Sequence, residues 1–440
     1  MRLLSIIIIL TVILSSGCKD GGIMADNDAV IADSASLRGV IRVNMKLMST
    51  PIMVDGALVS LHEGQSAEPW YPMKIFPDGS FCVYPFEVEW KPGDVFAEDN
   101  VEIAQDLSLP TNVKLLPDSD GGFYLFGTGN ERYSSSKQTA LVKFDKDCNV
   151  VYQLCEFYDV NNNAIPCKAI PLGDGRCALL IRCDSYYTEN FEYVPEEWNI
   201  RLIDKDGSTI SISKVEIDLS ESSVTTSKDG SFIYSCGDVL FFDCKSYDGE
   251  HHYVQSFDLN GKLLYQQEQD VFAELRDIIY TGNATILSYL HQDYEEQETE
   301  YGTSINVTGG HFFYTKVRSP HDFEVKYFEG SDSSYVFTGG VQCGSDEILY
   351  GYCIEKFVGM NDGFANNKVE HKGLIVKNDE VITFGGRTVK YILGVWEGNG
   401  LYTIYYKELQ PEVVDKENVN TGWDNFVCIY QTDDLKKLEN

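Results

Sequence analysis

The sequence predicts an all-β fold, a β-propeller of six blades with seven as the alternative count. One supporting observation is the stretch from Gly121 to Gln153, in which apolar β-prone runs flank a polar loop and a tight turn leads into a further run. The second is that its turn, which starts at Asp145, returns at Asp204 and Asp258, about 59 and about 54 residues apart. Periods of this length are typical of propeller blades.

The bulk composition limits the classes of partner. Acidic residues number 68 and basic residues 35, so the formal net charge is −33. A charge of this size repels phosphate backbones and anionic lipid headgroups, which argues against nucleic acid as a partner. Hydrophobic residues make up 43% of the chain and supply enough material for a packed core.

The N-terminus has the features of a secretion signal. A single Arg precedes an apolar run of about a dozen residues, which is too short to span a bilayer. The run ends in Ser15-Ser16-Gly17-Cys18, which resembles the lipobox of bacterial lipoproteins of the Bacteroidota type. The sequence departs from that pattern at Ser15, where Leu is usual. The resemblance implies a signal peptide over residues 1–17, lipidation of Cys18, and a membrane contact through the lipid anchor alone.

The next segments are predicted to be a tether and a small unit. Residues 18–36 are small and polar without periodicity, as expected of a flexible tether. Lys19-Asp20 resembles the charged signal of surface lipoproteins, so we expect an outer-membrane lipoprotein that is either periplasmic or surface-exposed. Residues 37–95 contain β-like runs and Asp-Gly turns, and we expect either a unit resembling transthyretin-like domains or a divergent blade.

Residues 104–440 can be laid out as six units of four strands. Three of these units align clearly, with apolar residues recurring at Leu141, Ile200 and Val254. The segments resemble secreted bacterial propellers that carry a GGFxxxG strand and an LVKxDxxGN hairpin. The Asp of each turn is expected to cap it, and Gly to take a left-handed conformation, a place that Cys148 occupies in the first unit. A two-sheet sandwich would not explain the regular local turns.

An up-and-down meander divides the connections between two faces. One face, called the tight-turn face, holds the short turns that join the first strand of each unit to the second and the third strand to the fourth. Lys205 and Lys262 lie in two of these turns. The long-loop face holds the remaining, longer connections, where function is expected. Aromatic residues predicted there as ligand-binding residues are Tyr133, Tyr186, Tyr187, Trp198, Tyr294 and Trp423.

The sequence offers little sign of catalysis. We find no HExxH, GxSxG, Walker or CxxC motif, and therefore predict no catalytic residue, no metal and no cofactor. Most of the 12 cysteines lie inside β runs, where they are expected to pack as small hydrophobes.

Three functions are compatible with these features. The leading prediction is a non-catalytic, lipid-anchored binding protein whose propeller loops bind a glycan, a peptide or a partner protein outside the cytoplasm. The alternatives are a propeller-type hydrolase or lyase that degrades glycans and a structural lipoprotein of envelope assembly.

Overall fold

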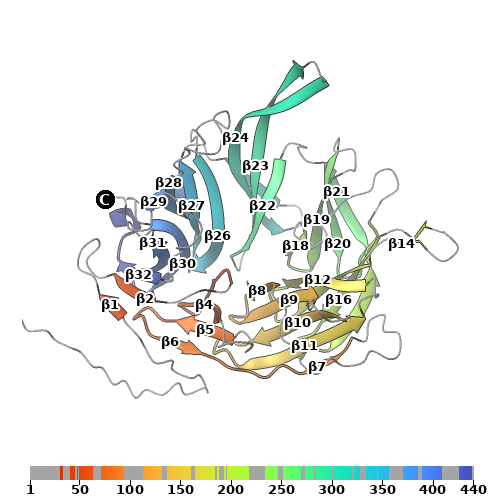
Figure 1. Cartoon of the computed structure of the whole chain (residues 1–440), viewed down its shortest axis with the longest axis horizontal. Helices are drawn as coiled ribbons and strands as arrows, with labels where there is room; N and C mark the ends of the chain where they lie inside the picture. The colour runs from red at the N-terminus through yellow and green to blue at the C-terminus, as the bar shows by residue number, and fades with distance from the viewer. Residues whose placement is uncertain are drawn as a thin grey trace, which may run out of the picture.

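Seven β-sheets follow one another around a central axis and form a β-propeller (Figure 1). The computed structural model describes residues 30–32, 40–44, 47, 49–62, 71–93, 112–130, 136–159, 164–183, 186–187, 193–194, 196–217, 233–245, 251–268, 273–281, 284–299, 302–319, 322–327, 333–343, 345–355, 370–384, 389–408 and 426–438. The all-β prediction is confirmed, and the blade count is the seven of the alternative.

Blades 1 to 3 are antiparallel meanders. Blade 1 comprises β3 (Ile52–Val54), β4 (Ala57–His62), β5 (Tyr71–Ile75) and β6 (Phe81–Val83). Blade 2 comprises β8 (Asn112–Pro117), β9 (Phe123–Asn130), β10 (Ser136–Phe144) and β11 (Val150–Asp159), with β7 (Trp90–Pro92) parallel to β11 at its outer edge. Blade 3 comprises β12 (Ala164–Pro171), β13 (Cys177–Cys183), β16 (Glu197–Ile203) and β17 (Thr209–Lys214), and a separate two-stranded ribbon, β14 (Tyr186–Tyr187) and β15 (Tyr193–Val194), lies between β13 and β16 in the chain.

Blades 4 to 6 repeat this arrangement. Blade 4 comprises β18 (Ile233–Cys236), β19 (Val239–Lys245), β20 (His252–Asp258) and β21 (Leu263–Glu268). Blade 5 comprises β22 (Ala273–Tyr280), β23 (Thr285–Thr299), β24 (Gly302–Ser319) and β25 (Asp322–Tyr327). Blade 6 comprises β26 (Ser333–Cys343), β27 (Asp346–Glu355), β28 (Glu370–Lys377) and β29 (Glu380–Phe384).

Blade 7 joins the two ends of the chain. Its C-terminal part comprises β30 (Val389–Gly398), β31 (Leu401–Glu408) and β32 (Phe426–Thr432), followed by a short 3-10 helix (Leu435–Leu438). The N-terminal strands are β2 (Ile41–Asn44), which pairs antiparallel with β32, and β1 (Val30–Ala32), which pairs with β2. Because a strand from the start of the chain completes the last blade, the ring is closed by backbone hydrogen bonds.

The recurring turns have the predicted chemistry. Asp145 Oδ1 accepts hydrogen bonds from the backbone N–H groups of Asp147 and Asn149, at 2.9 and 2.8 Å. Gly261 takes a φ of 79°, and a Cβ there would lie 2.1 Å from the carbonyl oxygen of Lys214 in the neighbouring blade. Cys148 adopts the same left-handed conformation, with a φ of 64°. The turn at Asp145 therefore has the same shape as the turns that carry Gly at this position.

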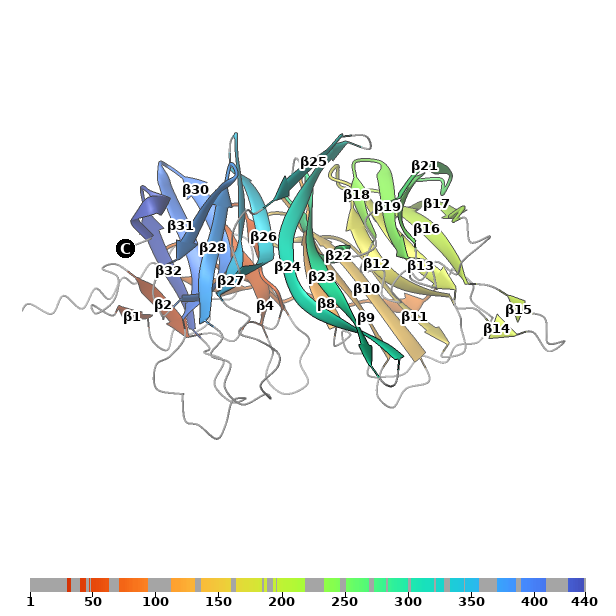
Figure 2. The same ribbon diagram turned by 90° about the horizontal axis from the view of Figure 1, so that it is seen from above.

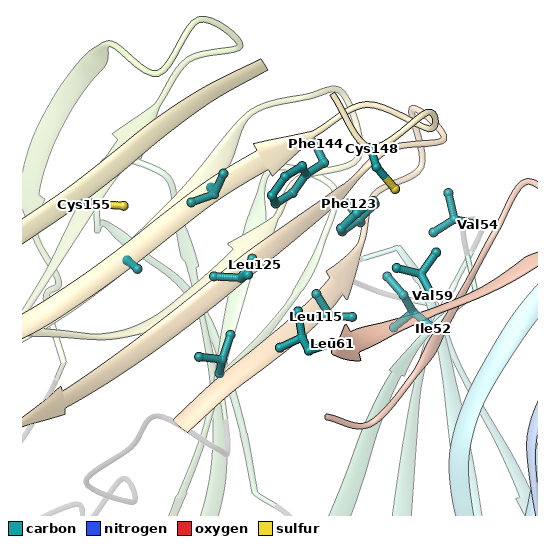
Figure 3. Packing of buried hydrophobic residues seen from close by; sticks show 13 residues of the cluster. Ile52, Val54, Val59, Leu61, Leu115, Phe123, Leu125, Phe144, Cys148 and Cys155 are labelled. Atoms are coloured by element: carbon teal, nitrogen blue, oxygen red, sulfur yellow. The ribbon is translucent and has the colours of Figure 1, made fainter. Parts of the chain in front are cut away.

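The core consists of a hydrophobic cluster between each pair of neighbouring blades. Figure 3 shows the cluster between blades 1 and 2, where Val59 and Leu61 pack against Leu115, Leu125 and Phe144. Corresponding clusters fill the other six interfaces around the ring. The apolar faces of the blades are thus buried against one another, as the repeat pattern predicts.

The hairpin of blade 5 differs from its expected form. Residues 291–310 were expected to be a long loop, but β23 and β24 pair from Gln292 with Gly310 to Thr299 with Gly302, with one shift of register between Asp293 and Tyr294. The hairpin extends well beyond the neighbouring blades (Figures 1 and 2). Residues such as Ile305 and Val307 have high β-propensity, and pairing satisfies the backbone groups of both strands.

Candidate functional site

A cavity of about 620 Å³ opens on the tight-turn face, where the turns after the first strand of each blade converge. Every blade contributes to its wall, through residues that include Asp55, Asp118, Leu172, Cys236, Thr281, Gln342 and Trp396. Because these residues lie at or just after the ends of the first strands, the cavity surrounds the propeller axis. A cavity of this volume is in the range that holds a small organic ligand.

Polar contacts between neighbouring blades hold the wall of the cavity in place. Thr285 Oγ1 of blade 5 donates to the carbonyl of Ser235 in blade 4 at 2.5 Å, and Ser235 Oγ donates to the carbonyl of Pro171 in blade 3 at 3.4 Å. Ser119 of blade 2 donates to the carbonyl of Gly173 in blade 3. Such contacts reduce the reorganisation that a ligand would have to impose on binding.

Charged groups on this face are grouped in clusters of one cation and two carboxylates. Four such clusters are described: Lys143 with Asp118 and Asp120, Arg176 with Asp174 and Asp238, Lys316 with Glu347 and Asp379, and Lys377 with Asp346 and Glu397. With all groups ionised, each cluster has a formal charge of −1. The four clusters together therefore contribute a formal charge of −4 to this face.

Asp118 is the buried carboxylate of the cavity wall. Its Oδ2 accepts from Lys143 Nζ, and its Oδ1 is buried without a hydrogen-bond partner among the described residues. Burial raises the pKa of the Asp118 carboxyl above its ordinary value, although the contact with Lys143 opposes the shift. Lys143 Nζ also lies 4.3 Å from the ring centroid of Tyr124, so cation and carboxylate are fixed together beneath the wall.

Aromatic and apolar side chains form the rest of the wall. Trp396 and Tyr280 both line the cavity, with Met53 and Val341. The indole of Trp396 lies close to the turn of blade 1, where a Cβ on Gly56 would be 3.1 Å from Trp396 Nε1. Burial raises the pKa of Tyr280, so this phenol stays neutral at physiological pH.

Trp198 does not lie on the surface as predicted. Its side chain is only 3% exposed, packs edge-on against Phe242 with ring centroids 5.8 Å apart, and donates its indole N–H to Glu196 at 2.8 Å. Residues 198, 200 and 202 alternate toward blade 4, so Trp198 belongs to the interface between blades 3 and 4. We therefore remove Trp198 from the candidate ligand-binding residues.

Three of the other predicted residues lie in described strands. Tyr186 and Tyr187 form β14, and Tyr294 is part of the β23–β24 hairpin. Cys18, Tyr133 and Trp423 lie outside the described residues.

Sequence reasoning placed the site on the long-loop face and missed the cavity. Its wall is assembled from seven short turns that are far apart in the chain, and none of them is a motif on its own. A partial signal exists in the Asp residues of these turns, at Asp118, Asp174 and Asp238, which recur after successive first strands.

Within the described ranges, no group of three or more His, Cys, Asp or Glu side chains is arranged to hold a metal ion. His252, near the start of β20, is fully buried, with Nε2 2.6 Å from Asp243 Oδ1. Among the described residues, no helix has the length and apolar character needed to cross a bilayer.

Comparisons with known proteins find distant structural matches only. No protein-family model and no curated protein matches the chain. Among solved structures, the β-propeller domain of the Trilobed protease from Pyrococcus furiosus has 12% identity and a TM-score of 0.34, over 67% of this chain and 77% of that domain. The polysaccharide lyase Uly1 has 8% identity and a TM-score of 0.42, over 87% and 88% of the two chains. Puromycin hydrolase has 10% identity and a TM-score of 0.41, over 88% of this chain and 52% of that one. At these identities the likeness concerns the fold alone.

Proposed function

We propose that this propeller is a binding protein whose ligand occupies the cavity on the tight-turn face. The observation that carries the proposal is the convergence of all seven blades on one cavity of about 620 Å³, with a wall held by contacts between blades. Concave sites with an apolar wall and a few placed polar groups are where small ligands bind. The ligand classes expected from the sequence, a glycan or a peptide fragment, both fit a cavity of this size.

We further propose that the protein acts outside the cytoplasm, tethered to the outer membrane through a lipidated Cys18. The support is the sequence alone: an apolar run of suitable length that ends in Ser-Gly-Cys. Two acyl chains on one residue suffice for stable anchoring. Cys18→Ser should abolish acylation and release the protein from membranes, as measured by fractionation and by the mass of the mature N-terminal peptide. An unchanged distribution with unchanged peptide mass would contradict the anchor.

The binding site can be tested by filling the cavity. We would screen small saccharides and dipeptides against the purified full chain by saturation-transfer NMR, and repeat the screen with Gln342→Trp. The larger side chain at a wall position should remove binding. The matched control is Lys214→Trp, which places an indole on an exposed residue at the other end of blade 3, away from the cavity.

The binding results for the wild type and the two variants distinguish three outcomes. Ligands that bind the wild type and the Lys214→Trp protein, but not the Gln342→Trp protein, support the cavity as the site. Ligands that bind all three proteins equally lie elsewhere and contradict the proposal. An absence of any binding by the wild type contradicts it as well, provided that thermal unfolding shows all three proteins to be folded.

A further inference from the structure

The hairpin of blade 5 ends in an arm that no described strand of a neighbouring element covers. We define the arm as residues 292–299 of β23 and residues 302–310 of β24, which form eight pairs with each other. Among the described residues, β22 pairs with β23 only as far as His291, and β25 pairs with β24 only from Phe313 onward. Both strands of the arm are therefore edge strands in the described part of the chain, and Figure 1 shows the arm extending away from the ring.

The open edges of the arm are places where a further strand can pair. An edge strand carries a row of backbone N–H and C=O groups that have no partner within the sheet. A two-stranded ribbon is only marginally stable in water, and a third strand would satisfy these groups and add contacts. Blade 5 itself does not need the arm, because β23 and β24 also pair from His291 with His311 to Thr285 with Val317. The arm is thus suited to binding a strand from another molecule.

The two strands of the arm differ in charge. Residues 292–299, QDYEEQET, include four acidic residues and no basic residue, whereas residues 302–310, GTSINVTGG, include no charged residue. Proteins usually protect an open edge with Lys, Pro or a bulge. Neither Lys nor Pro occurs in the arm, and the shift of register between Asp293 and Tyr294 lies at its base. The edge of β23 therefore stays open to pairing along its acidic positions, from Glu295 to Glu298.

These acidic positions determine which strand can pair with the edge. Residues directly opposite each other on neighbouring strands lie about 5 Å apart, so opposite charges attract there and like charges repel. A second copy that paired through the same edge would place acidic residues across from Glu295, Glu296 and Glu298, and would bring a second net charge of −33. A strand that carries Lys or Arg complements the carboxylates instead.

We propose that the edge of β23 in the arm binds an extended, basic segment of a partner protein, which adds as a third strand. The segment takes the place along β23 that β22 occupies closer to the ring, so that backbone hydrogen bonds supply the pairing and its cations supply the selectivity. The arm is separate from the cavity. β23 leaves the cavity wall at Thr285, and the arm begins seven residues later at Gln292, roughly 23 Å along a strand that rises about 3.3 Å per residue. The inference does not depend on the proposed function.

The test uses three peptides of equal length. The basic probe is KVKIKVKT, and the acidic probe is EVEIEVET. The third probe, KPKIKPKT, keeps all four lysines, but its prolines remove backbone donors and prevent regular strand pairing. Fluorescence anisotropy with the purified full chain should show the basic probe binding about tenfold or more tightly than either of the others. Bound basic probe should also slow hydrogen exchange of amides within residues 292–299.

A shortened variant assigns the binding to the arm. Residues 292–310 are replaced by Asn-Gly, a two-residue turn that joins His291 to its pairing partner His311 and leaves the rest of blade 5 unchanged. This variant should bind the basic probe about tenfold or more weakly than the full chain does. Thermal unfolding checks that the shortened protein is folded.

A pair of charge variants tests the selectivity. Glu295→Gln with Glu298→Gln keeps the arm, removes two of its charges and should weaken the basic probe about fivefold. The matched control is Glu197→Gln with Glu268→Gln, which removes the same charge from exposed residues of blades 3 and 4. The control should leave the affinity within a factor of about two, because attraction by the whole acidic surface changes equally in both proteins.

Equal binding of the basic and acidic probes, or of the basic and proline-containing probes, would overturn the inference. So would equal binding of the basic probe to the full chain and to the shortened variant, since general attraction by the acidic surface would then explain it. Self-association of the full chain that the shortened variant lacks, without a preference for the basic probe, would make a second copy the occupant and would also overturn it. A folded full chain that binds no basic probe contradicts it as well.

Discussion

Four cations on the tight-turn face each contact two carboxylates, whereas the described ion pairs farther along the blades join single partners. Arg201 binds Glu156 with both carboxylate oxygens within 3.0 Å of Arg201 Nη1, and Lys214 contacts Glu197 at 2.5 Å. The buried pair Arg201–Glu156 neutralises its charge and joins blades 2 and 3, whereas the exposed pair Lys214–Glu197 joins neighbouring strands of blade 3. In each cluster at least one carboxylate remains partly exposed, at 37% for Asp120, 64% for Asp238, 44% for Asp379 and 33% for Glu397, so water solvates the surplus charge.

The largest expected effect comes from breaking the one-to-one pair between blades 2 and 3. Arg201→Met leaves Glu156 buried without its cation, and should lower the free energy of unfolding by about 3–5 kcal/mol. The double variant Arg201→Met with Glu156→Gln should recover much of this loss. Denaturant unfolding measures both. A single variant that loses less than about 1 kcal/mol would mean that the buried pair does not hold the two blades together.

An intermediate effect is expected at Asp277 on β22, the first strand of blade 5. Burial raises the pKa of this carboxyl to about 6, while Arg276 opposes the shift. Because the folded-state pKa is raised, the group's contribution to stability is present below about pH 4 and is lost as the pH rises through about 6. Asp277→Asn should therefore raise the free energy of unfolding at pH 7.5, by at most about 3 kcal/mol, and change little at pH 4. A gain that is equal at both pH values would contradict this account.

The smallest effects on stability are expected at two exposed ion pairs, Lys146–Asp55 beside the cavity and Lys214–Glu197 far from it. Lys146→Gln breaks the contact with Asp55 at the cavity, and Lys214→Gln breaks the contact with Glu197 far from it. Each should change stability by less than about 1 kcal/mol, because both partners are solvated. Thermal unfolding should not distinguish them. A loss of more than about 2 kcal/mol in either variant would contradict the expectation that solvated pairs contribute little to stability.

The repeat could be predicted from sequence because the strands and turns of each blade are formed by residues that are close together in the chain. The turn at Asp145 has its capping residue and its left-handed position within five residues, so its pattern recurs visibly at Asp204 and Asp258. The closure of blade 7 was not predictable in this way. It pairs Ile41 with Ile429, near opposite ends of the chain, and no local pattern records such a pairing.

The candidate site escaped prediction for a related reason. Long connections were favoured as functional, yet the cavity is built from turns of a few residues that converge only after the ring has closed. Trp198 illustrates the opposite error, since its position next to a long connection suggested exposure. The alternation of Trp198, Ile200 and Leu202 already indicated a strand with one buried face, which is where the structure places it.

The central claim, that ligands bind at the tight-turn face, is tested most directly by photoaffinity labelling. A benzophenone derivative of a saccharide or dipeptide that binds in the NMR screen would be irradiated with the purified full chain, and the modified peptides mapped by mass spectrometry. We expect labelling within residues 53–55, 117–122 and 340–342, and protection of these peptides by an excess of the same ligand without the benzophenone. Labelling concentrated at residues 186–198 and 251–252, with no modification of the cavity wall, would contradict the claim.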